Sequence, residues 1–330
     1  MKSLTSFTLF LLTCFIFTES FGVSNDSPDL SLKSENDLTW SEWINKTKEK
    51  LKFHNFKDST LNQLDKITFN KRVIELDRKQ PEFKINFNQY KKNLITKERK
   101  KQLKKNYIQN LNLLKKIESN YNIDIKTLVS LWAIETSFGK HVGKFNIIRS
   151  LCSLSYDGRR KDFFFNELVN AMTIIDDEHI KVKDFKGSWA GAFGQTQFMP
   201  STFINYAVDF DNDKKINLFN KQDALASGAN YLSLMGWNNK LIWGEKIDIK
   251  LDEKLKKFSK EKTYKKRKYW ESYGIFLKKK YNDDDLMRLI IPDSIDNQVY
   301  LVTKNFDVLL GWNRSNYFAL TVFLLSDEIN

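Results

Sequence analysis

Apolar residues recur at intervals of three and four along much of the chain. The pattern over residues 40–47, 96–121 and 304–329 places these side chains on one face of a helix. Asp124, after a short break, predicts the N-cap of a further helix over residues 125–136. The hydrophobic pattern therefore predicts a mainly α-helical protein.

Two segments in the last third of the chain follow a different period. Residues 246–251 and 296–302 alternate polar and apolar positions, which predicts strands. A basic segment over residues 254–281 lies between them and has a helix-like pattern. We therefore expect a small β-containing insertion, residues 245–308, among the helices.

Composition narrows the class of protein. With 330 residues, 41% hydrophobic and 14% aromatic, the chain can bury a sizeable core, and a mean hydropathy of −0.50 excludes a polytopic membrane protein. A formal net charge of +13 favours an anionic partner: nucleic acid, a membrane surface or an acidic polymer. The 54 basic residues comprise 45 Lys and only 9 Arg. This ratio weakens the case for nucleic acid, because base recognition relies on the bidentate Arg fork.

The N-terminus has the pattern of a signal peptide. Lys2 precedes an apolar run of 11 residues, 7–17, which is too short to span a bilayer as a mature helix. Ser20 and Gly22 place small residues before a cleavage site that follows Gly22. We therefore expect a signal peptide over residues 1–22 and export from the cytoplasm, with an uncleaved anchor as the alternative.

Such cleavage leaves one cysteine. Cys14 would depart with the signal peptide, and the polar residues 23–39 that follow predict a linker. Cys152 lies in the apolar stretch 147–152, which favours a buried structural cysteine over a nucleophile. The exported protein would then be stabilised by its core rather than by disulfides.

A carboxylate completes an apolar stripe on the helix predicted over residues 125–136. Leu128, Leu131, Trp132 and Glu135 stand at i, i+3, i+4 and i+7. Burial raises the pKa of a carboxyl group, and a general acid must be neutral at the working pH. Glu135 is therefore a candidate general acid, and a structural Glu paired with an Arg or a backbone amide at the helix end is the alternative. We find no second acidic residue in an equivalent apolar setting.

A glycine-rich segment lies further along the chain. Residues 187–198 hold three Gly, two Gln and three aromatic residues. Small residues let a polymer approach the backbone, while the amides of Gln195 and Gln197 and the aromatic rings suit hydrogen bonding to sugars and stacking on them. The alternative is a glycine-rich turn that leads into a helix after Pro200.

These two motifs resemble those of the B-type lytic murein transglycosylases. The resemblance is carried by Ala133-Ile-Glu-Thr-Ser-Phe-Gly139 and Gly187-Ser-Trp-Ala-Gly-Ala-Phe-Gly-Gln-Thr-Gln-Phe-Met-Pro-Ser201, and it extends to residues 73–83, 229–237 and 312–319. With this resemblance we expect a mainly α fold that has a lysozyme-like helical core.

The expected core comprises residues 116–244 and 309–330. A helical N-terminal domain over residues 40–115 would pack beside it, and the β-containing insertion over residues 245–308 would interrupt it.

The resemblance implies an enzyme that cleaves the β-1,4 bond between N-acetylmuramic acid and N-acetylglucosamine in peptidoglycan. The muramic acid O6, rather than water, attacks C1 and leaves a 1,6-anhydro sugar. One carboxylate therefore serves first as acid and then as base, whereas ordinary glycosidases need two carboxylates. By this resemblance Glu135 is that carboxylate. A catalytically silent peptidoglycan-binding protein and a water-using muramidase are the alternatives.

The resemblance also implies residues that bind the sugar or shape the site: Ser188, Gln197, Tyr231, Asn313 and Tyr90. Trp312 stands where many members have Tyr, so stacking is expected to survive while a hydroxyl contact is lost. No cofactor is required for the chemistry.

A loop of alternating aspartates predicts a cation site. Asp209, Asp211 and Asp213 stand at alternate positions, and the backbone carbonyl of Lys215 follows, which suits a hard cation such as Ca²⁺. An ordinary EF-hand would have Gly at its sixth position and Glu at its twelfth, and this chain has neither. The resembling family has a lengthened loop closed by a later Asp, which Asp223 matches. A capped loop between helices is the alternative to this structural Ca²⁺ site.

The resemblance places the exported protein in the periplasm, with membrane anchoring as the alternative. Its expected partner is the glycan strand of peptidoglycan, whose peptide carboxylates complement the net positive charge. Cell-wall synthesis or division proteins are further candidate partners. We expect no nucleic acid partner, and a monomer.

Overall fold

The computed structural model describes residues 38–79, 85–293, 295 and 298–329. The described chain is mainly helical, which confirms the predicted class, and its short strands form two separate sheets. The expected signal peptide, its cleavage site and Cys14 lie outside the described residues. In the described part of the chain, no helix is both long enough and apolar enough to cross a bilayer.

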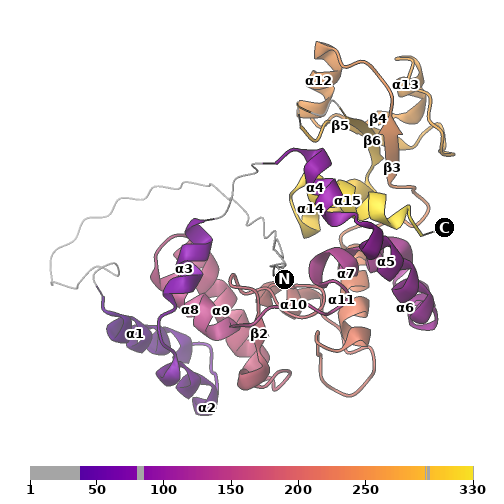
Figure 1. Ribbon diagram of the computed structural model, residues 1–330. Helices are drawn as coiled ribbons and strands as arrows, with labels where there is room; N and C mark the ends of the chain where they lie inside the picture. Colours follow the sequence, from indigo (N-terminus) through magenta and orange to yellow (C-terminus); the bar gives the residue numbers. More distant parts are fainter. Residues whose placement is uncertain (1–37, 80–84, 294, 296–297, 330) are drawn as a thin grey trace, which may run out of the picture.

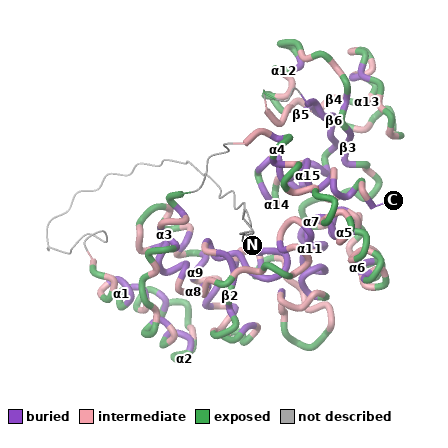
Figure 2. Tube along the Cα trace, in the orientation of Figure 1, coloured by how far each residue is buried: buried purple, intermediate pink, exposed green. Residues whose placement is uncertain are grey.

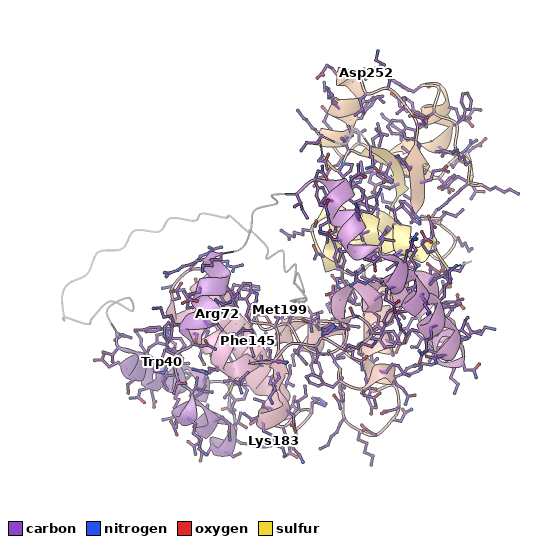
Figure 3. The ribbon with its side chains drawn as sticks, in the orientation of Figure 1. Trp40, Arg72, Phe145, Lys183, Met199 and Asp252 are labelled. Carbon is purple, nitrogen blue, oxygen red and sulfur yellow. The ribbon has the colours of Figure 1, made fainter. Side chains whose placement is uncertain are left out.

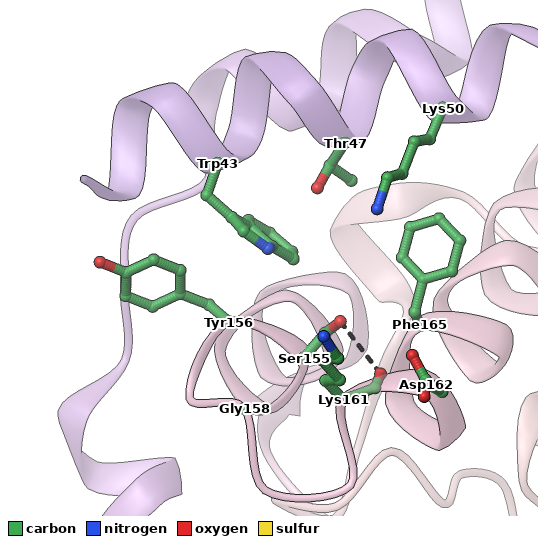
Figure 4. Close-up of a pocket in the computed structure, with 9 residues that line it drawn as sticks. All are labelled: Trp43, Thr47, Lys50, Ser155, Tyr156, Gly158, Lys161, Asp162 and Phe165. Atoms are coloured by element: carbon green, nitrogen blue, oxygen red, sulfur yellow. Dashed lines mark hydrogen bonds between the residues drawn. The ribbon is translucent and has the colours of Figure 1, made fainter. Parts of the chain in front are cut away.

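One group of helices forms the lobe at the lower left of Figure 1. It consists of α1 (Trp40–Lys52), α2 (Asp58–Leu61), the 3₁₀ helix η2 (Asn62–Lys66), α3 (Lys71–Arg78), α8 (Ile147–Tyr156) and α9 (Lys161–Asp176). The helices α8 and α9 pack against each other, α3 packs on α8, and α2 packs on α9. Trp43 and Thr47 of α1 line a small pocket together with Tyr156 and Phe165 (Figure 4). The N-terminal helices are thus joined to a helical pair from the middle of the chain.

A second group surrounds α7 (Ile125–Thr136). Its members are α4 (Phe87–Leu94), α5 (Lys97–Gln109), α6 (Leu111–Tyr121), α11 (Lys221–Leu234), α14 (Asn305–Trp312) and α15 (Asn316–Ser326). The helices α5, α6, α11 and α15 contact α7 directly, while α4 and α14 pack on α15. Nine of the 12 residues of α7 are buried, as a helix that is apolar on most of its faces requires (Figure 2). The helix α7 is therefore the centre of this group.

A short helix joins the two groups. It is α10 (Pro200–Tyr206), which contacts α9 on one side and α11 on the other. Met199 precedes it and lies near the middle of the molecule in Figure 3, whereas Asp252 lies at the outer end of the small sheet region.

The helix predicted over residues 96–121 is broken in two. The helix α5 ends at Gln109 and α6 begins at Leu111, because Asn110 between them has φ −111° and ψ 11°. The Asn110 side chain donates a hydrogen bond to the Asn106 carbonyl at 2.7 Å. Side-chain bonds of this kind compete with the regular helical pattern, and the hydrophobic period does not record them.

The predicted β-containing insertion holds a four-stranded antiparallel sheet. Its strands are β3 (Gly244–Ile247), β4 (Lys265–Lys266), β5 (Leu286–Ile290) and β6 (Val299–Thr303), in the order β3-β6-β5-β4. The helices α12 (Glu253–Lys260) and α13 (Arg267–Glu271) accompany it, and its buried residues form a core of their own around Trp270 and Leu289. The basic segment predicted as helical over 254–281 is divided instead, because Lys265 and Lys266 pair with β5.

A two-stranded sheet lies beside the glycine-rich segment. It pairs β1 (Phe145–Asn146) with β2 (Lys186–Gly187), which follows the 3₁₀ helix η3 (Val182–Asp184). Cys152 of the adjoining α8 is a free, fully buried thiol, and burial raises its pKa. The expectation of a structural cysteine is confirmed.

Candidate active site

The end of α7 positions the carboxyl group that the sequence singles out. Asp124 caps the start of the helix by accepting the N–H groups of Lys126 and Thr127 at 3.1 and 3.0 Å. At the other end, Ser137, Phe138 and Gly139 have φ values of 50°, 64° and 79°. This left-handed run turns the chain sharply after Thr136 and leaves Glu135 in the last helical turn.

Two features require a glycine at position 139: its positive φ and the close approach of another side chain. A Cβ atom there would lie 2.4 Å from Oε1 of Gln195, which belongs to the glycine-rich segment. Gln195 in turn accepts the indole N–H of Trp132 at 2.9 Å and donates to the Phe219 carbonyl at 2.7 Å. Its amide is therefore occupied within the protein and fixes the glycine-rich segment against α7.

Glu135 is half-buried, and its pKa is far above the ordinary value. Burial raises the pKa of this carboxyl from 4.5 to about 8, because the charged form loses hydration. One hydrogen bond opposes the rise: Trp312 Nε1 donates to Glu135 Oε1 at 2.9 Å. At neutral pH the group is a neutral carboxylic acid, as general acid catalysis requires.

Trp312 links Glu135 to a cluster of aromatic rings. Its ring centroid lies 5.1 Å from that of Tyr231 and 5.4 Å from that of Phe198, both in edge contacts. Burial also raises the pKa of the Tyr231 hydroxyl to about 12, so that group stays protonated. The sequence predicts neither these ring contacts nor the bond from Trp312 to Glu135, because a local pattern cannot relate residues 177 positions apart.

The glycine-rich segment holds the next two predicted residues. Ser188 is buried, and its hydroxyl accepts the N–H of Ala192 at 3.0 Å. The Gln197 amide donates to the carbonyls of Gly194 and Val142 at 2.8 and 3.2 Å. Its oxygen Oε1 is buried and has no hydrogen-bond partner among the described residues. Gln197 thus retains an unoccupied hydrogen-bond acceptor. The Ser188 hydroxyl, by contrast, stabilises the turn of the glycine-rich segment.

The remaining predicted residues come from opposite ends of the chain. Tyr90 of α4 is buried, and the desolvation of its hydroxyl, with the negative charge of Glu135 second, raises its pKa, whereas Arg99 lowers it. This coupling places Tyr90 in the electrostatic surroundings of Glu135. Asn313 follows Trp312 directly and accepts the N–H of Ser315 at 3.1 Å. The structure therefore brings Tyr90, Tyr231 and Asn313 into the neighbourhood of Glu135 and Trp312.

A second buried carboxyl corrects one expectation from the sequence. Glu167 of α9 is 4% exposed, and burial raises its pKa. Phe164, Leu168 and Ala171 flank it at the same spacing that identifies Glu135. Both Glu167 oxygens are occupied, however, by the N–H and the hydroxyl of Ser201, at 2.9 and 2.6 Å. Glu167 therefore caps the first turn of α10 and is not exposed to a substrate.

The predicted cation loop brings carboxylates together. Oxygen atoms of Asp209, Asp211 and Asp223 lie within 4.8 Å of one another, whereas Asp213 is not in this group. Asp213 instead accepts the N–H of Lys215 at 2.8 Å. Three converging carboxylates form a donor set of the kind that a hard cation such as Ca²⁺ takes, so the residues present fit the expected ion.

The loop accommodates the absence of the EF-hand glycine. Lys214 adopts a φ of 71° at the position where a glycine is expected. Its N–H donates to Asp209 at 2.8 Å. The loop then returns to the glycine-rich segment, since the Gln195 N–H donates to the Leu218 carbonyl at 2.8 Å.

Solved structures resemble this fold closely. SltB3 from Pseudomonas aeruginosa, in complex with NAG-NAM-pentapeptide, superposes with a TM-score of 0.84 at 30% identity over 88% of this chain and 79% of that chain. The Escherichia coli lytic transglycosylase Slt35, in complex with calcium, gives a TM-score of 0.74 at 26% identity over 88% of this chain and 92% of that chain. These likenesses confirm the predicted lysozyme-like helical fold.

Sequence comparisons agree with the structural ones. The membrane-bound lytic murein transglycosylase B of Escherichia coli (strain K12) is 29% identical over 214 residues, which cover 63% of this chain and 58% of that protein. The chain thus matches less than two thirds of the length of this relative. The model of the transglycosylase SLT domain family matches residues 39–327, nearly the whole described chain. The protein therefore belongs to the transglycosylase SLT domain family.

Proposed function

We propose that the protein is a lytic transglycosylase that cleaves the β-1,4 bond between N-acetylmuramic acid and N-acetylglucosamine in peptidoglycan. The observation that carries this proposal is the Glu135 carboxyl, neutral at physiological pH, with its pKa near 8 and a single indole donor at 2.9 Å. Family membership supports it, as do the complexes of SltB3 with NAG-NAM-pentapeptide and with NAG-anhNAM-pentapeptide.

In this proposal Glu135 acts twice. The neutral acid gives its proton to the glycosidic oxygen as the bond from C1 to that oxygen breaks. The resulting carboxylate then accepts the proton of the muramic acid O6 as that oxygen bonds to C1. The product is a 1,6-anhydro sugar, and Glu135 returns to its protonated state without consuming water.

A single carboxylate is consistent with the surroundings of Glu135. Burial raises its pKa and the bond from Trp312 lowers it, and no carboxylate of the described residues is among the causes of the shift. Two further buried glutamates of the described residues are occupied, Glu167 by Ser201 and Glu245 by the N–H groups of Lys278 and Lys279. An inverting hydrolase would need a second carboxylate to activate water, so these contacts favour the anhydro product over hydrolysis.

The proposal includes a set of substrate-binding residues. Ser188, Gln197, Tyr231, Asn313 and Tyr90 are proposed to bind the sugar or shape its site. Gln197 has the most specific contribution to offer, because its buried Oε1 can accept an amide N–H or a hydroxyl that no described residue supplies. Tyr231 and Trp312 offer aromatic faces and edges beside the acid.

A structural Ca²⁺ is proposed for the loop. Asp209, Asp211 and Asp223 would hold it by their carboxylates, with Asp213 and the Lys215 carbonyl as the remaining proposed ligands. The ion would neutralise the mutual repulsion of the carboxylates. The Slt35 structure that contains calcium supports this assignment.

The location and organisation follow from the same proposal. We place the protein in the periplasm, with residues 1–22 as its signal peptide and residues 23–39 as a linker. Residues 40–115 would form the N-terminal domain, residues 116–244 and 309–330 the catalytic core, and residues 245–308 the insertion. A monomer that acts on glycan strands is the simplest state, and cell-wall synthesis or division proteins are further candidate partners.

Digestion of purified sacculi tests the reaction. The mass of the released muropeptides should be that of anhydro products, and Glu135→Gln should abolish their release, whereas Glu49→Gln, at an exposed site, should not. Products with reducing ends would show instead that the protein is a hydrolase. If the parent protein binds sacculi but releases no muropeptides, the protein is a catalytically silent binding protein.

A further inference from the structure

The helix α4, which carries Tyr90, lies between the sheet of the insertion and α15 (Figure 1). It has only eight residues, and Phe87 and Tyr90 are the two that are buried. An isolated helix of this length is not stable in water, so its position depends on tertiary contacts. The contacts that hold α4 therefore decide where Tyr90 lies.

A carboxylate of the insertion binds the start of α4. The N–H of Phe87, the first residue of the helix, donates to Asp293 Oδ2 at 2.7 Å. The same oxygen accepts the hydroxyl of Tyr317, on α15, at 2.8 Å. The first N–H groups of a helix lack partners within the helix, and its positive end favours an anion. One side chain of the insertion thus joins α4 to α15.

A buried amide of the insertion binds the same helix. Gln298 is 6% exposed, and its Nε2 donates to Asn88 Oδ1 at 2.6 Å. Its Oε1 accepts the Tyr300 hydroxyl at 2.9 Å and the Lys91 ammonium at 3.5 Å. Both ends of the amide therefore contact α4, while Tyr300 fixes the amide to β6. A buried network of this kind is a rigid support.

Packed rings connect these supports to Tyr90. The ring centroid of Phe87 lies 6.0 Å from that of Tyr300 and 5.2 Å from that of Tyr317. The Tyr317 ring in turn lies 5.5 Å from the Tyr90 ring, in an edge contact. Because protein interiors are close-packed, a shift of one of these rings displaces the next. The position of Tyr90 thus depends on the acceptor that holds Tyr317.

The Tyr90 hydroxyl is the group whose position matters. It is buried and has no hydrogen-bond partner among the described residues. Desolvation, and after it the charge of Glu135, raises the pKa of this hydroxyl, which therefore lies within electrostatic reach of the acid. A buried hydroxyl without a partner is costly, so this one is available to a substrate group.

We propose that Asp293 and Gln298 are positioning residues, which hold α4 so that the Tyr90 hydroxyl stays beside Glu135. They act through the helix and the Tyr317 ring and do not bind the sugar themselves. The insertion is then a support of the active site. The use of Tyr90 in the reaction rests on the proposed function, whereas the contacts of α4 do not.

The rate of muropeptide release from purified sacculi by the full-length protein tests this inference. Asp293→Ala should lower kcat/KM about tenfold, because a small misplacement of a group in the site is enough to slow the reaction. Asp293→Asn keeps a carbonyl oxygen that can accept both bonds, so it should recover most of the activity.

Asp252→Ala is the matched control for the loss of a capping carboxylate. Asp252 accepts the Leu255 N–H at 2.7 Å at the start of α12, which lies at the outer end of the insertion (Figure 3). This variant also removes a helix cap from the insertion, but it leaves α4 untouched and should be as active as the parent. An equal loss of activity in Asp252→Ala and Asp293→Ala would overturn the inference.

A double-mutant cycle separates positioning from a general loss of stability. In a Tyr90→Phe background, Asp293→Ala should cause little further loss of kcat/KM, because the hydroxyl that it positions is absent. Losses that multiply would overturn the inference. If Asp293→Ala does not fold, Gln298→Leu takes its place in the cycle, because it removes the other support of α4 and keeps the bond to Phe87.

Fluorine NMR of the full-length protein labelled with 3-fluorotyrosine measures the position of Tyr90 without any activity. Its resonance, assigned by its absence from Tyr90→Phe, should shift in Asp293→Ala and Gln298→Leu but not in Asp252→Ala. An unshifted resonance in both support variants would overturn the inference. If the parent releases no muropeptides, the proposed function fails, and a shifted resonance still supports the positioning of Tyr90. If anhydro products form and Asp293→Ala is as active as the parent, only the positioning role fails.

Discussion

Glu135 should make the protein less stable as the pH rises, and its amide variant should remove this dependence. The carboxyl has a pKa of about 8 in the folded protein and 4.5 as its ordinary value. Because the folded value is the higher one, its contribution to stability is complete below pH 4.5 and is lost as the pH rises toward 8. The Glu135→Gln variant stays neutral at every pH and keeps an oxygen that can accept the Trp312 N–H.

The size of this change in the free energy of unfolding follows from the binding of one proton per molecule. Between these two pKa values the unfolded chain releases a proton that the folded chain retains, and the free energy of unfolding falls by about 1.4 kcal/mol per pH unit. From pH 5 to pH 7.5 the stability advantage of Glu135→Gln over the parent should therefore grow by about 2–3 kcal/mol, after allowance for solvent that reaches the half-buried carboxyl.

Urea denaturation of both proteins at pH 5 and pH 7.5 measures this difference. Glu49→Gln is the matched control, since Glu49 is exposed on α1 and, among the described residues, forms an ion pair with Lys52 at 2.7 Å. It should change stability by less than about 1 kcal/mol at either pH. A stability difference between Glu135→Gln and the parent that is the same at both pH values would refute a folded-state pKa near 8.

Three other changes test the site and its supports. Trp312→Phe removes the bond that holds the pKa of Glu135 down, so the alkaline limb of the kcat/KM profile should move up by about one pH unit; an unmoved limb would show that the bond does not tune the acid. Gly139→Ala should destabilise the protein by about 2 kcal/mol more than Gly236→Ala in thermal unfolding, because both have positive φ but only Gly139 faces a side chain at 2.4 Å; equal losses would exclude the contact. Asp211→Asn should weaken Ca²⁺ binding about tenfold or more by calorimetry, and more than Asp213→Asn does; no heat in the parent would exclude the ion.

The central helix and its acid were predictable because both depend on local periodicity. The apolar stripe over residues 125–136 identifies α7 and shows that a carboxyl completes it. The same rule applied to α9 identifies Glu167, whose neighbours Phe164 and Leu168 are also buried. The period thus finds buried carboxyls, but it cannot tell an occupied one from a free one, because the Ser201 that occupies Glu167 lies 34 residues away.

Two features could not be predicted from the hydrophobic period of the sequence. The bond from Trp312 to Glu135 joins residues from opposite halves of the chain, and only the packing of α14 and α15 against the core brings them together. The division of the helix over 96–121 depends on the side-chain bond of Asn110 rather than on its hydrophobic period. The hydrophobic period therefore indicates which elements form, but it records neither the local side-chain bonds that interrupt a helix nor the tertiary contacts between distant elements.

The indole at Glu135 has a consequence for inhibitor design. An indole N–H can only donate, whereas a phenol at this position could both donate and accept. With Oε1 accepting from Trp312, the acidic proton of the neutral carboxyl is favoured on Oε2. A basic nitrogen intended to mimic the protonated leaving group should therefore be aimed at Oε2, and a ligand that approaches Oε1 must first displace the indole.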